Sequence, residues 1–317
     1  MIAPLGLTAA FILDLIVGDP EWSFHPIRLI GRLITRLEAL LRTLSPDLMS
    51  EKTGGVVLCL TVVCLTYGTV WALIYGAYAI NGYCGFILTG IIVFFSLSLK
   101  SLGKAAQEVR RALADNDEVA ARKHLSHIVG RDTGTLSRED MVRATVETVA
   151  ENTSDGIVAP LFFVLLGGAP LAMSYKAINT LDSMVGYKDE KYCHFGWASA
   201  RCDDLANYLP ARITGILLVT GAFLLGKDWR NGMRTMVRDA SKHASPNSGY
   251  PEAAVAGALK IQLGGTNYYG GVARTAHFLG NRGAPLNEHA IGDAVNMMYC
   301  ASLLMFLFCL LVLRVFA

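Results

Sequence analysis

Charged residues are scarce in this 317-residue chain. Lys, Arg, Asp and Glu together make up 17% of it, whereas a soluble globular protein carries about 25%. Hydrophobic residues make up 53%, and the net charge is only +2. This composition excludes a disordered, fibrous or nucleic-acid-coating protein, and no nucleic-acid partner is expected. It favours an integral membrane protein in which polar segments join apolar spans.

Several familiar motifs are also missing. The seven cysteines include no C-x-x-C pair, so the sequence indicates neither a zinc ribbon nor a disulfide framework. There is no G-x-G-x-x-G and no H-E-x-x-H. The run Gly221–Lys227 imitates a Walker A loop, but Asp228 stands where a Ser or Thr would bind Mg²⁺. The apolar N-terminus lacks a basic region before Arg28, which argues against a cleaved signal peptide.

The apolar stretches predict an all-α, polytopic membrane protein. No charged side chain occurs from Thr53 to Leu99, which is room for two spans of about 20 residues each, with a break at Asn81-Gly82. No convincing strand alternation is found. We therefore expect one integral-membrane domain over residues 1–317, a helical bundle with about four to six membrane segments and cytoplasmic helical loops. The expected spans are 1–18, 55–80, 84–99 and 298–317, with re-entrant or spanning segments at 157–174 and 208–226.

The distribution of Lys and Arg predicts an orientation. Segments 19–52 and 100–156 carry many positive charges, and the turn near Asn81 carries none. Because cytoplasmic loops are enriched in Lys and Arg, the two segments should face the cytoplasm. A full crossing by 157–174 would place Lys176, Lys191 and other cations outside, so we favour a re-entrant element there.

An acidic stripe precedes the apolar run at 157. Glu147, Glu151 and Asp155 recur every four residues and so share one helical face. Carboxylates grouped in this way suit Mg²⁺, which takes oxygen ligands and shares them with substrate phosphates. The alternative is structural, since Arg143 stands four residues before Glu147 and the two side chains would simply pair.

Two further segments concentrate polar residues. Lys176, Asn179 and Asp182 fall on one face of a helix that follows an apolar run, and ionisable groups at membrane depth are usually functional. The adjacent carboxylates Asp203 and Asp204 repel each other unless a cation lies near. The alternatives are a buried Lys–Asp pair in the first segment and helix capping in the second.

The remaining two segments are loops. Asp19, His25 and Arg28 follow the first span in a stretch with two prolines and two aromatics, which is either an interfacial anchor or one wall of a site. The run 244–252 is a turn followed by a helix start, where Pro251 suits the first helical position and Glu252 the positive helix end.

These segments, in this order, resemble the cobinamide-phosphate synthases of cobalamin biosynthesis (the CbiB/CobD type). The strings that carry the resemblance are Asp-Pro-Glu-Trp with His-Pro-Ile-Arg, Val-Glu-Thr-Val-Ala-Glu-Asn-Thr-Ser-Asp-Gly, Tyr-Lys-Ala-Ile-Asn-Thr-Leu-Asp-Ser-Met-Val-Gly-Tyr-Lys, Phe-Gly-Trp-Ala-Ser-Ala-Arg and Ser-Pro-Asn-Ser-Gly-Tyr-Pro-Glu. They are dense over 130–212 and strong over 19–31 and 241–270.

The resemblance implies an integral-membrane enzyme, an ATP-dependent ligase. It implies an amide bond between adenosylcobyric acid and (R)-1-aminopropan-2-ol O-phosphate, which gives adenosylcobinamide phosphate. The resemblance also implies ATP and Mg²⁺, with the corrinoid and aminopropanol phosphate as substrates. It implies an inner-membrane location with cytoplasmic site loops, and association with other membrane enzymes of cobalamin assembly. Two alternatives remain: a non-catalytic regulatory relative, and a corrinoid transporter, for which the internal repeats are missing.

Residue type and clustering assign expected roles, because carboxylates suit the metal and cations suit phosphate oxygens. His25 is a candidate base on residue type alone, since histidine is the side chain whose intrinsic pKa lies near neutrality. The expected catalytic residues are His25, Glu147, Glu151, Lys176 and Asp182. The expected metal ligands are Glu151, Asp155, Asp182, Asp203 and Asp204. The expected ATP- and substrate-binding residues are Asp19, Arg28, Asn152, Asn179, Lys188, Arg201, Asn207, Arg212, Asn247 and Glu252.

Overall fold

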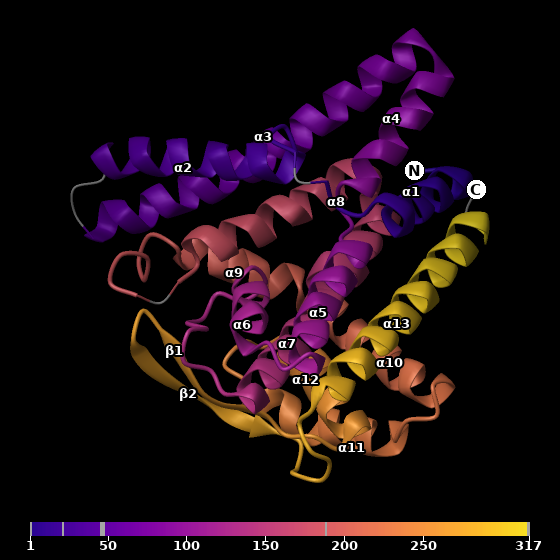
Figure 1. Cartoon of the computed structure of the whole chain (residues 1–317). Helices are drawn as coiled ribbons and strands as arrows, with labels where there is room; N and C mark the ends of the chain where they lie inside the picture. The colour runs from indigo at the N-terminus through magenta and orange to yellow at the C-terminus, as the bar shows by residue number, and fades with distance from the viewer. Residues whose placement is uncertain (1, 21, 45–47, 188, 316–317) are drawn as a thin grey trace. The chain divides into compact units, whose positions relative to one another are not determined.

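The computed structural model describes residues 2–20, 22–44, 48–187 and 189–315. The chain forms two compact units, and each is assembled from segments that are far apart in the sequence (Figure 1). Unit 1 comprises Met1–Ser98, Ala159–Asn207 and Phe308–Ala317. Unit 2 comprises Leu99–Val158 and Tyr208–Leu307.

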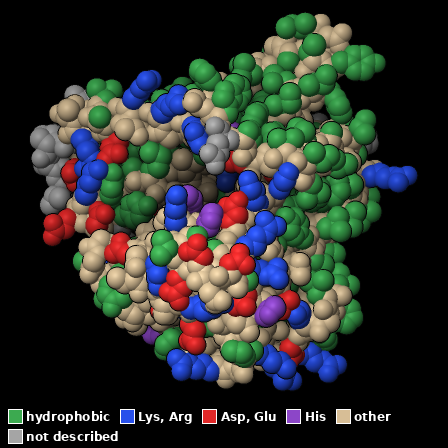
Figure 2. Space-filling view, viewed as in Figure 1, with side chains coloured by type: hydrophobic (Ala, Val, Ile, Leu, Met, Phe, Trp, Pro, Cys, Tyr) green, Lys and Arg blue, Asp and Glu red, His purple; other side chains and the backbone are tan. Residues whose placement is uncertain are grey.

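Unit 1 is built on a long helical hairpin. Its helices are α1 (Pro4–Val17), α2 (Pro26–Leu44), α3 (Leu48–Ile80), α4 (Gly82–Phe94), α8 (Ala159–Val185) and α9 (Trp197–Ala206). The break expected at Asn81-Gly82 is confirmed, because the Asn81 side chain caps α4 by accepting a hydrogen bond of 2.7 Å from the backbone N–H of Tyr83. Apolar side chains cover the exposed faces of α3 and α4 (Figure 2).

Unit 2 combines shorter helices with one β-hairpin. Its elements are α5 (Leu99–Ala114), α6 (Glu118–Ser126), α7 (Arg138–Thr153), the π-helix η1 (Ser154–Val158), α10 (Tyr208–Leu224), α11 (Trp229–Asp239), the 3₁₀ turn η2 (Ala240–Lys242), α12 (Gly249–Leu259), β1 (Leu263–Tyr269), β2 (Val272–Leu279) and most of α13 (Glu288–Val315). The small residues of α12 let it pack closely on α10 and α11, and every residue from Gly249 to Ala258 except Tyr250 is buried.

Among the described residues, four helical stretches are long and apolar enough to cross a membrane. They are Ser50–Ile80, Gly82–Ala114, Arg138–Val185 and Glu288–Val315, and the bent pair formed by α9 and α10 makes a fifth if it crosses as one. The shorter α1 is also apolar. The all-α, polytopic architecture expected from the sequence is therefore confirmed.

Helix α8 is broken inside the apolar run that was expected to be re-entrant. Gly167 and Gly168 have non-helical backbone angles, and Pro170 follows them. At φ +69°, Gly168 occupies a region that side chains with a Cβ avoid. Pro170 then restarts the helix without the N–H that an interior residue would donate.

The expectation that the chain contains no strand was wrong. β1 and β2 pair antiparallel, with Tyr269 opposite Val272 and an irregular register between Leu263 and Gly265. Gly270 and Gly271, both at positive φ, form the two-residue turn. Most side chains of β2 are exposed, so neither face imposes alternation on the sequence. The Gly-Gly pair was the signal that could have revealed the hairpin.

The carboxylate of Asp239 fastens the end of this hairpin to α11. It is 1% exposed, and it accepts hydrogen bonds from the backbone N–H of Gly280 at 2.9 Å, from Arg238 at 2.5 Å and from Lys242 at 2.6 Å. Arg238 and then Lys242 and the Gly280 N–H hold the pKa of Asp239 well below its ordinary value, although burial opposes them.

We expect Asp239→Asn to lower the free energy of unfolding by about 1–3 kcal/mol at pH 7, because it removes a charged acceptor from buried donors. Because the folded pKa is lowered, the ionised carboxylate of Asp239 stabilises the folded protein at pH values above the ordinary carboxyl pKa. This stabilisation is lost as the pH falls from there toward the lowered folded pKa. Thermal unfolding in detergent should therefore show a deficit that shrinks from pH 7 to pH 3. A deficit independent of pH would contradict this account.

Candidate active site

A buried group of ionisable side chains lies in unit 2, and we call it the ionic cluster: Arg131, Arg143, Glu147, Glu151 and Glu252. Glu147 is its centre. One carboxylate oxygen of Glu147 lies 2.8 Å from Arg131 Nη1, and the other accepts the backbone N–H of Gly264 at 2.8 Å and lies 3.5 Å from Arg143 Nη1. The pairing of Arg143 with Glu147 predicted as the structural alternative therefore occurs.

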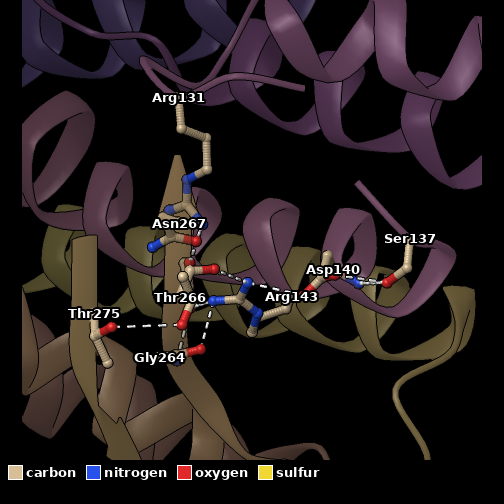
Figure 3. A network of polar contacts seen from close by, with 9 residues as sticks. Arg131, Ser137, Asp140, Arg143, Gly264, Thr266, Asn267 and Thr275 are labelled. Atoms are coloured by element: carbon tan, nitrogen blue, oxygen red, sulfur yellow. Dashed lines mark hydrogen bonds and ion pairs between the residues drawn. The ribbon is translucent and has the colours of Figure 1, made fainter. Parts of the chain in front are cut away.

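The two arginines connect α7 to the β-hairpin (Figure 3). Arg143 donates to the carbonyl oxygens of Gly264 and Thr266 and to Asp140, which lies 2.9 Å from Nη2. Arg131 donates to the side-chain oxygen of Asn267 at 2.9 Å. Sequence reasoning missed Arg131, because it precedes α7 and no helical spacing relates it to Glu147. Its place in the densely matching stretch after residue 130 was the available signal.

Glu151 occupies a different position from Glu147. It is half-buried, and the hydroxyl of Ser248 donates to its Oε1 at 2.7 Å. Ser248 lies in the turn before α12, so two segments predicted separately come together here. In the described part of the chain Glu151 forms this hydrogen bond and no ion pair with an arginine, so its surroundings differ from those of Glu147.

Glu252 is 5% exposed and lies near both other glutamates. Burial, and then the charges of Glu147 and Glu151, raise the pKa of Glu252 well above its ordinary value. His243 lies 3.8 Å away through Nε2 and is held by the Ser245 backbone N–H at Nδ1.

We expect Glu252→Gln to raise the midpoint of thermal unfolding at pH 8 relative to the wild type. The folded carboxyl keeps its proton at a pH where the unfolded one has lost it, so wild-type stability falls as the pH rises above about 4.3. Gln removes this cost, and the difference should vanish near pH 4. The same measurement on Glu139→Gln, an exposed position of α7, is the control, and equal curves for E252Q and wild type would contradict the prediction.

Arg212 lies between two tyrosine rings in the same unit. Its guanidinium carbon is 3.5 Å from the centroid of Tyr208 and 4.3 Å from that of Tyr250, and it donates to Asn247 at 3.5 Å. Stacking fixes the guanidinium plane. The predicted binding residues Arg212 and Asn247 therefore do lie together.

A second polar group, the aspartate cluster, lies in unit 1: Tyr175, Asn179, Asp182, Asp203 and Asn207. Asp203 accepts from the side-chain amide of Asn207 at 3.0 Å and of Asn179 at 3.5 Å, and Tyr175 donates to Asn207 at 2.8 Å. Asp182 lies close enough to Asp203 for their charges to interact. The two segments predicted around Asp182 and Asp203 thus meet, across α8 and α9.

Asp203 and its neighbour Asp204 have different surroundings. Asp204 lies 3.4 Å from the exposed Arg201, whereas Asp203 is held between two asparagines. The predicted residues therefore separate by unit. Unit 1 holds Asp19, His25, Arg28, Lys176, Asn179, Asp182, Arg201, Asp203, Asp204 and Asn207, and unit 2 holds Glu147, Glu151, Asn152, Asp155, Arg212, Asn247 and Glu252. Lys188 lies outside the described residues.

His25 lies at the start of α2. Its Nδ1 accepts the backbone N–H of Ile27 at 3.3 Å, its Nε2 lies 2.7 Å from Asp19, and its ring packs on Phe95. The side chain is buried, and its catalytic role stays a prediction.

Asp155 lies within the π-helix η1, and Asn152 bonds its own helix at the carbonyl oxygen of Thr148. π-Helical turns are rare and occur frequently at functional sites. Lys176, in the following helix α8, is buried. The roles expected for Asn152, Asp155 and Lys176 stay predictions.

The donor sets differ in how well they suit Mg²⁺. Within residues 2–20, 22–44, 48–187 and 189–315, no three His, Cys, Asp or Glu side chains are grouped as a metal would need. Glu147 is already paired with Arg131 and Arg143, so it does not suit Mg²⁺. Asp182 and Asp203 supply two carboxylates with amide groups beside them, and Mg²⁺ is commonly held by one or two carboxylates with substrate phosphates completing its shell.

A cavity of about 460 Å³ adjoins the ionic cluster in unit 2. Arg143, Gly264 and Thr266 line it from one side, and Phe278 and Arg282 are also in its wall. The cavity brings the buried Arg143 and the exposed Arg282 together with the exposed ring of Phe278, a combination suited to a polar organic ligand.

The chain is similar to known proteins over most of its length. Residues 7–298 match the family described as CobD/Cbib protein. The chain is 50% identical over 304 residues to the cobalamin biosynthesis protein CobD of Geobacter metallireducens, which covers 96% of this chain and 93% of that protein. It is 47% identical to the cobalamin biosynthesis protein CbiB of Salmonella typhimurium, over 93% of this chain and 92% of that one. No solved structure matches the chain.

Proposed function

The chain belongs to the CobD/CbiB family of cobalamin biosynthesis proteins, and from that premise we propose that it is the membrane ligase that completes the corrinoid side chain. It joins adenosylcobyric acid to (R)-1-aminopropan-2-ol O-phosphate through an amide bond, with ATP consumed, and gives adenosylcobinamide phosphate.

One observation carries this proposal: Ser248 and Glu151, 97 residues apart, meet at 2.7 Å at the edge of the ionic cluster. The strings that contain them are among those that resemble the ligases. A membrane protein that keeps several carboxylates buried together pays heavily in desolvation, which favours a chemical role for some of them.

The chemistry divides into two displacements. A carboxylate oxygen of the corrinoid attacks the γ-phosphorus of ATP, so ADP leaves and an acyl phosphate forms. The amine nitrogen then attacks the acyl carbon, and inorganic phosphate leaves. The amine reaches the reaction as an ammonium ion and must lose a proton, and we assign Glu151, held in place by Ser248, as the base that takes it.

We assign phosphate recognition to Arg212, whose guanidinium plane is fixed by Tyr208 and Tyr250. Asp182 and Asp203 are the residues that would hold Mg²⁺. When bound, Mg²⁺ supplies charge neutralisation for the ATP phosphates. The Lys and Arg bias of the sequence supports a cell-membrane location with the site loops on the cytoplasmic side.

The test is turnover by purified protein in detergent, given adenosylcobyric acid, aminopropanol phosphate, ATP and MgCl₂, with products identified by mass. We expect a corrinoid heavier by aminopropanol phosphate less water, formed only when ATP is present, together with ADP. AMP in place of ADP would replace the acyl phosphate by an acyl adenylate. Folded protein that binds corrinoid but forms no product would refute the ligase and favour a carrier.

A further inference from the structure

Helix α2 of unit 1 has the character of a membrane-surface helix. It carries four Arg against one Glu, with apolar residues on the opposite side. Arg28, Arg32 and Arg36 follow one another at four-residue intervals and are all exposed. Basic side chains stand along the upper edge of this helix (Figure 2). Before it, Trp22 and Phe24 are 53% and 62% exposed, as aromatic anchors at a membrane interface are.

These arginines are largely uncommitted. Arg32 donates to the carbonyl oxygen of Ser23 at 2.7 Å through one of its nitrogens. Arg28 and Arg36 form no ion pair with any residue in the described part of the chain. A row of like charges with so few internal partners repels itself, and an external anion would relieve that repulsion.

An apolar groove of about 360 Å³ lies along α2 and α3, within the same unit. Leu29 and Leu33 of α2 line one wall, each next in sequence to an arginine of the row. Leu65 and Leu73, two helical turns apart on α3, line the other wall. The buried side chain of Met173 closes the groove toward α8.

We propose that this face binds one anionic phospholipid, with the phosphate on the Arg32–Arg36 row and an acyl chain in the groove. Charge complementarity selects an anionic head group, because guanidinium groups bind phosphate oxygens in a bidentate way. The apolar walls select a hydrocarbon tail, and the two features adjoin along α2 as a head group adjoins its tail. The site is separate from the chemistry proposed above and stands even if that proposal fails.

Native mass spectrometry of delipidated protein tests this. We expect the wild type to retain one molecule of dioleoyl phosphatidylglycerol and to bind dioleoyl phosphatidylcholine at least tenfold more weakly. The double variant Arg32→Gln, Arg36→Gln should lose at least tenfold in affinity for phosphatidylglycerol, as expected for two basic groups near an anionic surface. The matched control is Arg230→Gln, Arg234→Gln, two exposed arginines on α11, which should bind like the wild type.

Two further arms separate a lipid from a free phosphate. Leu73→Trp, which fills the groove without changing charge, should also weaken the phosphatidylglycerol adduct, and glycerol 3-phosphate at millimolar concentration should not displace it. Equal binding of the two lipids, an undiminished adduct in R32Q/R36Q or in L73W, or displacement by glycerol 3-phosphate would each overturn the proposal. Circular dichroism of every variant checks that the helices are intact.

Discussion

Replacing Glu151 by Gln should lower turnover by about 10²- to 10⁴-fold, the range that a positioned general base contributes. Gln is nearly isosteric and still presents an oxygen to the Ser248 hydroxyl, so the 2.7 Å contact that orients the side chain is preserved. What the amide lacks is the ability to take a proton from the ammonium substrate. The measurement is the initial rate of adenosylcobinamide phosphate formation at saturating ATP, with the melting curve recorded alongside.

The pH profile separates this role from a structural one. If the variant lacks a base, its residual rate should rise with pH as more free amine is present in solution. Glu118→Gln, which removes a carboxylate from a half-buried pair with Arg122, is the matched control and should keep full activity. Unchanged turnover by E151Q, in a protein that still unfolds at the wild-type temperature, would remove Glu151 from the mechanism.

Asp203→Asn should raise the Mg²⁺ concentration needed for half-maximal turnover by at least tenfold and should lower the maximal rate. If Asp182 and Asp203 hold the metal together, the loss of one charge weakens the attraction for a divalent cation. The asparagine keeps one oxygen for its neighbour Asn207. The measurement is a MgCl₂ titration of turnover at fixed ATP, repeated with Asp182→Asn, which should show the same direction.

Asp189→Asn, an exposed position in the loop before α9, serves as the control for lost negative charge. Asp204→Asn makes the sharper comparison, because Asp204 lies 3.4 Å from the cationic Arg201. We expect the Mg²⁺ requirement of D204N to change less than that of D203N. If D203N, D204N and wild type all need the same Mg²⁺ concentration for half-maximal turnover, Asp182 and Asp203 do not hold the metal.

The helical architecture could be predicted from local sequence because its causes are local. The uncharged stretch from Thr53 to Leu99 and the Asn81 cap define the α3–α4 hairpin without reference to the rest of the chain. The four-residue spacing of Glu147 and Glu151 likewise placed both carboxylates on one side of α7. The hairpin formed by β1 and β2 was missed because it is too exposed to impose alternation.

What the sequence did not reveal was which groups meet these side chains. Glu147, predicted as a catalytic residue, is a buried ion-pair partner of Arg131 and Arg143, and its catalytic role stays a prediction. Ser248 and Glu151 form a hydrogen bond, although residues 159–207, which separate them in the sequence, belong to unit 1. Such contacts depend on long-range packing, and no spacing rule within one helix encodes them.

The discontinuity of unit 2 also bears on how the protein is made. Glu147 accepts a hydrogen bond from the backbone N–H of Gly264, which follows it by 117 residues. Residues 159–207, which lie between the two in the sequence, belong to unit 1. At about 5–20 residues per second, the ribosome completes Glu147 roughly 6–23 seconds before Gly264 exists. During that interval α7 holds its charges with neither the hairpin nor the turn before α12 in place. Codons that slow translation between residues 208 and 264 should therefore lower the yield of folded protein more than the same codons placed after residue 280.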